Sequence, residues 1–111
     1  MKSYVAFAAI ALAGLAATPA IGHELGYAMY TQWNDTTLNL ADCKRHGELA
    51  LRNSGFSRDF TVTRNSVYGR REGGYTAAIR CITSKEIVFF VISGPKGSLS
   101  SQYLKEIVGN Y

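Results

Sequence analysis

The chain is poor in the residues from which most catalytic and metal sites are built. Its 111 residues include two cysteines, two histidines and eight acidic residues, and the acidic residues do not cluster. There is no Gly-x-Ser-x-Gly segment of the kind that holds a hydrolase nucleophile. No run of Lys and Arg is longer than two, which gives little support to nucleic-acid binding. The sequence therefore favours a protein that is not an enzyme and uses no cofactor, and an enzyme of unrecognised type is the least favoured interpretation.

Long apolar runs are also rare, and the clearest one lies at the N-terminus. Lys2 precedes an apolar stretch over residues 4–17, and small residues of the kind that signal peptidase requires follow it. The stretch is shorter than the about 20 residues that cross a bilayer, and no cysteine follows it to accept a lipid anchor. We expect a signal peptide at residues 1–22, cleaved after Ala20 or Gly22, and one domain at residues 23–111. The mature chain is then periplasmic or secreted, with no stable membrane insertion.

Cys43 and Cys81 are the only cysteines. In a small exported domain, an even number of cysteines usually indicates a disulfide. A metal site is the alternative, because Cys43 and His46 are one helical turn apart and Cys81 and His23 would complete four ligands. Because thiols tend to oxidise in that compartment, we predict a Cys43–Cys81 disulfide.

Hydrophobic periodicity divides the mature chain into four strands and two helices. The strands are expected at residues 27–33, 60–68, 75–83 and 86–93, and the helices at residues 40–54 and 98–111. Residues 69–74 are expected to form a mobile loop, and Ser84-Lys85 a two-residue hairpin turn. This order predicts an α+β fold: a two-layer sandwich with both helices on one face of a mainly antiparallel four-stranded sheet.

Three residues are expected to shape the helices. Asn39 is predicted to cap the first helix, and Gly55 to end it in the left-handed conformation. Gly47 lies within the apolar stripe of that helix, where it would allow close approach to the sheet. Ser98 is predicted to cap the last helix.

Two segments share a pattern with known proteins. Cys-x3-Gly-x2-Ala-Leu-x3-Gly-Phe begins at Cys43, and Tyr-Thr-Ala-Ala-Ile-Arg-Cys ends at Cys81. Together they resemble small exported bacterial proteins of hypothetical function. The resemblance spans most of the mature chain, but its motifs are mostly packing residues. It implies neither an activity nor a site.

The hairpin register predicts an apolar surface on the side of the sheet that faces away from the helices. If Cys81 pairs with Val88, the next pairs place one set of residues on that side. The predicted set is Ile82, Ile87, Arg80, Phe89, Ala78 and Val91. Residues 87–92 form a continuous apolar run, which is typical of strands buried on both faces. We therefore expect a partner protein or a second copy of the chain to bind there, unless residues 23–34 or the Arg70 loop fold over it.

Four further residues are candidate anion contacts. Arg70 and Arg71 are adjacent, and Lys96 and Ser98 lie where the last helix begins. The simpler interpretation is a solvated loop for Arg70 and Arg71, and a plain strand-to-helix turn for Lys96 and Ser98.

The sequence thus predicts an exported, disulfide-linked, non-catalytic interaction module, such as an inhibitor, an immunity-type protein or an accessory protein. A small-ligand or copper carrier is the alternative. For copper, His23 would supply its amino group and imidazole if cleavage follows Gly22.

Overall fold

The computed structural model describes residues 28–111. The predicted signal peptide, its cleavage site and His23 lie outside the described residues. The elements in chain order are β1 (Ala28–Asp35), α2 (Leu40–Asn53), β2 (Arg58–Val62), β3 (Ser66–Arg71), β4 (Tyr75–Ile82), the short 3₁₀ helix η1 (Thr83–Lys85), β5 (Ile87–Gly94) and α3 (Gly97–Asn110).

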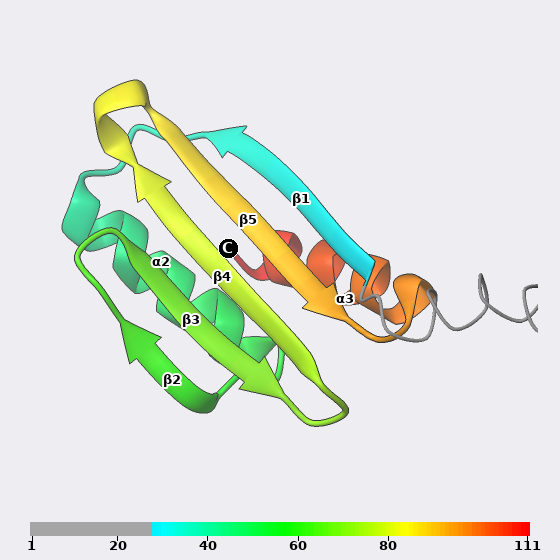
Figure 1. Cartoon of the computed structure of the whole chain (residues 1–111). Coiled ribbons are helices and arrows are strands. Elements are labelled where there is room, and N and C mark those ends of the chain that lie inside the picture. Colours follow the sequence, from blue (N-terminus) through cyan, green and yellow to red (C-terminus); the bar gives the residue numbers. More distant parts are fainter. Residues whose placement is uncertain (1–27) are drawn as a thin grey trace, which may run out of the picture.

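The strands form one antiparallel sheet in the order β1-β5-β4-β3-β2. Both helices lie behind this sheet in Figure 1, with α2 packed against β3 and β4 and α3 packed against β5 and β1. The predicted α+β class is therefore confirmed. The sheet has five strands rather than the four expected.

The extra strand arises because the Thr- and Val-rich segment at 60–68 is two strands and not one. The chain turns at residues 63–65, where the Thr63 amide donates to the carbonyl oxygen of Ser66 over 2.8 Å. The Thr63 hydroxyl also accepts from the Ser66 amide. The expected loop at 69–74 is correspondingly shorter, because Arg70 and Arg71 continue β3. Only residues 72–74 turn, with Gly73 and Gly74 at positive φ.

The hairpin between β4 and β5 has the predicted register but a different turn. Cys81 pairs with Val88 and Ile82 with Ile87. The connection is η1 followed by Glu86 in the left-handed conformation, at φ 58°. Ser84-Lys85 lacks the Asn-Gly or Gly chemistry of a two-residue turn, so the chain turns through a longer loop without changing the pairing.

The ends of α2 agree with the sequence, whereas the start of α3 does not. The Asn39 side chain accepts from the Asp42 amide over 2.8 Å, and Gly55 follows the helix at φ 86°. In α3 the capping residue is Lys96, which has no side-chain capping bond. The prediction of Ser98 as cap is wrong, because extended backbone already gives way to helix after Lys96.

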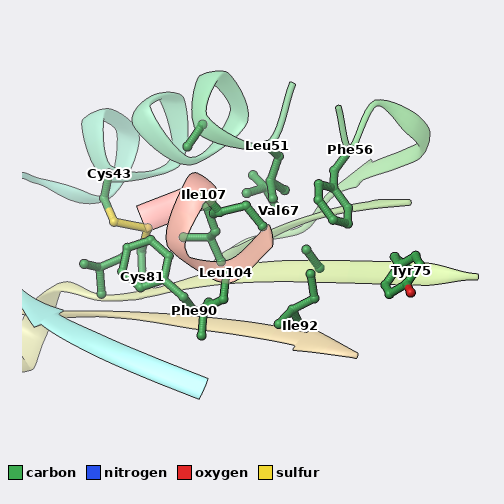
Figure 2. Packing of buried hydrophobic residues seen from close by; sticks show 14 residues of the cluster. Cys43, Leu51, Phe56, Val67, Tyr75, Cys81, Phe90, Ile92, Leu104 and Ile107 are labelled. Atoms are coloured by element: carbon green, nitrogen blue, oxygen red, sulfur yellow. A yellow bond between two sulfur atoms is a disulfide. The ribbon is translucent and has the colours of Figure 1, made fainter. Parts of the chain in front are cut away.

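The core fills the space between the helices and the sheet (Figure 2). A disulfide joins Cys43 of α2 to Cys81 of β4, as predicted, with an S–S distance of 2.06 Å. Gly47 faces the sheet as expected, since a Cβ atom there would lie 3.0 Å from Cγ2 of Val67 and 3.4 Å from Cγ2 of Ile79. α2 is thus held to the sheet by a covalent link and by close backbone approach.

Candidate interaction surface

Alternate residues of β5 point to opposite sides of the sheet. Val88, Phe90 and Ile92 are fully buried beneath the helices. Ile87, Phe89 and Val91 point away from them and are half-buried. We call the side opposite the helices the outer face.

The outer face contains every residue predicted for it. In the register of β4 and β5, Ile82 pairs with Ile87, Arg80 with Phe89 and Ala78 with Val91. Because directly paired residues of an antiparallel sheet share a face, these six residues form one contiguous surface. Only Arg80 among them is charged, and its Nη1 lies 3.3 Å from the Ser66 hydroxyl.

Strand β1 extends this surface with two large side chains that sequence reasoning did not assign to it. Met29 pairs with Ser93 and Trp33 with Phe89, so both belong to the outer face. Met29 is 66% exposed and Trp33 is 57% exposed. On the other flank Tyr68 of β3 pairs with Ala78 and is 37% exposed. The alternating residue types of β1 indicate a strand with two different faces. They do not indicate that β5 is the neighbouring strand.

The register arranges the outer face in rows that cross the strands. One row runs from Trp33 through Phe89 to Arg80, and a second from Thr31 through Val91. The second row continues through Ala78 to Tyr68. The centre of the face is therefore aromatic and aliphatic, with a single cation placed beside a ring.

Within residues 28–111, nothing folds over the outer face. Residues 28–34 belong to β1 and lie within the sheet, and Arg70 lies within β3. Both helices pack on the opposite side. Of the covering segments considered from the sequence, only residues 23–27 lie outside the described residues.

The four predicted anion contacts do not come together in one site. Arg70 pairs with Asp59 at 3.6 Å, and both line a cavity of about 230 Å³ beside the turn at residues 72–74. Arg71 also lines this cavity, and acidic Glu72 does as well. Lys96 and Ser98 do not line it. Arg58 does line it, so three arginines and two carboxylates give the cavity mixed charge.

Arg71 has a structural role that the sequence did not reveal. Its Nη1 donates to the carbonyl oxygen of Ser54 over 2.8 Å. Its guanidinium lies 4.1 Å from the ring centre of Tyr103 and 3.7 Å from the Glu106 carboxylate. Arg71 therefore connects β3 to the end of α2 and to α3.

His46 of α2 is half-buried. Its Nδ1 lies 3.3 Å from the backbone oxygen of Tyr111, whose hydroxyl donates to Cys43 Sγ over 3.2 Å. Burial raises the pKa of the Tyr111 hydroxyl, and a hydrogen bond with Thr36 opposes that shift. The Tyr111 side chain thus packs beside the disulfide, and the His46 ring lies 5.6 Å from the Tyr111 ring, measured between their centres.

The described residues hold no cluster of three or more His, Cys, Asp and Glu side chains suited to a metal ion. The copper site proposed for His23 stays a prediction, since that residue is not among those described. Neither α2 nor α3 has the length and apolar content to cross a membrane. No protein-family model matches the chain, and no curated protein is significantly similar to it.

Proposed function

We propose that this chain is an exported, non-catalytic protein-interaction module whose outer face binds a partner protein, in the manner of an inhibitor, an immunity-type protein or an accessory protein. One observation supports the proposal above all others. Among residues 28–111, the core is packed on one side of the sheet and a second apolar surface lies open on the other.

The chemistry of the outer face suits protein recognition. Tryptophan, tyrosine and arginine are the residues most often found at the energetic centres of protein interfaces. Here Trp33, Phe89 and Arg80 occupy one row, and Tyr68 lies in the next. Large apolar patches rarely stay bare on monomeric proteins. A partner that covered this row would bury aromatic surface. Arg80 would keep the Ser66 hydroxyl as a hydrogen-bond acceptor.

Two features support a location outside the cytoplasm. The Cys43–Cys81 disulfide is typical of oxidising compartments, and the residues at positions 1–22 have the pattern of a signal peptide. Together they favour a periplasmic or secreted protein. The disulfide also gives so small a domain a rigid scaffold on which to present its outer face.

The test compares two acidic substitutions in the mature protein. Phe89→Glu places a charge in the central row, and Leu49→Glu makes a comparable change at a side chain of α2 that is 53% exposed. Immobilised wild-type protein is used to capture and identify a partner from an extract of the host periplasm, and binding of the purified partner is then measured by calorimetry. We expect Phe89→Glu to weaken binding at least tenfold and Leu49→Glu to leave it unchanged.

Circular dichroism separates this outcome from misfolding. At an open binding surface, Phe89→Glu should retain the wild-type spectrum and a cooperative unfolding transition. If Phe89→Glu unfolds the domain, the outer face is a covered core and the proposal is wrong. Equal binding by the folded Phe89→Glu protein and the wild type would also refute it.

A further inference from the structure

The two edges of the sheet differ in how they are protected against pairing with another strand. Native sheets commonly protect an edge with a short strand, a bulge or charged side chains. β2 has all three: it spans only Arg58–Val62, its pairing with β3 is irregular between Arg58 and Thr61, and it contains the charged residues Arg58 and Asp59. β2 is therefore poorly suited to accept a further strand.

β1 lies at the opposite edge of the sheet (Figure 1) and is neither short nor bulged. It has eight residues and pairs with β5 without interruption from Ala28 to Asp35. It contains neither proline, lysine nor arginine, and its single charge is Asp35 at the C-terminal end. Within residues 28–111, no strand pairs with its far edge. An unprotected edge of this length is a ready template for another strand.

We propose that β1 pairs in antiparallel orientation with β1 of a second copy of this chain, which joins two five-stranded sheets into one continuous sheet. The proposal goes beyond the function proposed above, because the outer face of a single chain could bind a partner without it. An interface in which the same strand meets itself is closed by a twofold axis, as in most homodimers.

The residues of β1 select one register. When Thr31 lies opposite the partner's Thr31, Met29 lies opposite the partner's Trp33 on the outer face. Tyr30 then lies opposite the partner's Gln32 on the helix side. Met29 and Trp33 are the most exposed large apolar side chains in residues 28–111, and sulfur–aromatic contacts between such side chains are favourable. The pairing therefore covers both side chains in both copies at once.

The single charge of β1 disfavours the alternatives. In the Thr31-centred register Asp35 lies beyond the last pair, which is Ala28 with the partner's Asn34. A shift that centres the pairing on Gln32 would place Asp35 opposite the partner's Met29 instead. A parallel arrangement would align each Asp35 with its copy, and like charges side by side are destabilising.

This arrangement keeps both outer faces on the same side of the joined sheet. Paired residues share a face, so the row that now ends at Trp33 continues into the partner's Met29 row, and only the Thr31 row continues into its own copy. The dimer would then present one continuous apolar platform to a partner, with the helices of both copies behind it.

Cysteine trapping tests the pairing directly. In mature Thr31→Cys protein the two introduced cysteines would be directly opposite, with Cα atoms about 4.5–5.5 Å apart, which is within the range for a disulfide. The native cysteines are both bridged, so they do not compete. We expect mild oxidation to convert most Thr31→Cys protein to a covalent dimer on a non-reducing gel.

The matched control is Tyr68→Cys, which places a thiol on the same face but on β3. We expect it to stay largely monomeric. Equal trapping of both variants would indicate stacking of outer faces and overturn edge pairing. Failure of Thr31→Cys to form dimer under conditions that oxidise free thiols would overturn it as well.

Light scattering on proteins without added cysteine gives an independent measure. We expect a dimer for the wild type and for Tyr68→Lys, and a monomer for folded Thr31→Lys, in which two lysines would be opposed at the twofold axis. A wild-type monomer at about 100 µM, where a micromolar complex would be formed, overturns the proposal. So does a Thr31→Lys protein that remains dimeric.

The two proposals fail separately. Phe89 is on β5 and does not lie at the edge, so Phe89→Glu should remain a dimer while it loses the partner. A monomeric wild type that still binds a partner through Phe89 would refute the dimer alone. A trapped dimer whose partner binding is insensitive to Phe89→Glu would refute the proposed function alone.

Discussion

Replacing Gly47 with leucine is the sharpest test of how α2 meets the sheet. A Cβ atom at this position would already lie 3.0 Å from Cγ2 of Val67 and 3.4 Å from Cγ2 of Ile79. The first distance is tighter than ordinary van der Waals contact. Three further carbon atoms have to be accommodated in the same gap, so either the helix must move away from the sheet or the side chains beneath must change rotamer.

The magnitude follows from two opposed terms. Overpacking a core costs typically 1–3 kcal/mol, and the tight first contact places this site near the upper end. The higher helix propensity of leucine relative to glycine offsets about 1 kcal/mol of this loss of stability. We expect a net loss of about 2 kcal/mol for Gly47→Leu, and a change near zero for Gly47→Ala, where one methyl group meets the same gain. In a domain of this size, 2 kcal/mol corresponds to about 8–16 °C in the melting temperature.

Thermal unfolding followed by far-ultraviolet circular dichroism measures the effect, with intact mass used to confirm the disulfide. The matched control is Gly109→Leu in α3, because a Cβ atom there has no neighbour within 4 Å. Gly109→Leu should leave the melting temperature unchanged or raise it. If Gly47→Leu melts at the wild-type temperature, α2 is rotated relative to the sheet and the packing argument is wrong.

Two further predictions concern the disulfide and the tyrosine beside it. The Cys43–Cys81 bridge has a sequence separation of 38, so the chain-entropy model predicts a loss of about 4 kcal/mol in urea unfolding when both cysteines are changed to alanine; a loss below about 1 kcal/mol would contradict it. Burial raises the pKa of Tyr111 above its unfolded value, so the folded state retains this proton where the unfolded state has lost it. Stability from this group is present below pH 10 and declines as the pH rises through the folded pKa, and Tyr111→Phe should weaken that decline; equal slopes for the two proteins from pH 9 to 11 would refute the assignment.

The sequence predicted best those features whose signals lie close together in the chain. Short connections limit the possible registers, so the pairing of Cys81 with Val88 could be deduced although the turn itself differed. The cap at Asn39 and the left-handed Gly55 are local for the same reason. Ser98 was misassigned because a capping residue type can equally well occupy the first turn of a helix that has already begun.

Features that depend on distant segments were not predictable. The position of β1 beside β5 follows from how the whole sheet assembles, and periodicity contains no information about strand order. For that reason Met29 and Trp33 were not assigned to the outer face, although Phe89 and Val91 were. The division between β2 and β3 was missed because threonine favours strands and also supplies the hydrogen bonds that turn the chain at Thr63.

The position of β1 also has a consequence for the order in which the molecule assembles. β1 is the first strand of the described chain, and its only partner there, β5, is the last. Closing the long loop between β1 and β5 costs conformational entropy before any contact between them forms. Such pairing is therefore slow. The segment between Cys43 and Cys81 contains β2, β3 and most of α2 and β4, and it can be crosslinked into a covalent ring before β1 docks. We expect β1 to join the sheet late in folding. The strand with the least protected edge is then also the strand that stays unpaired for the longest time.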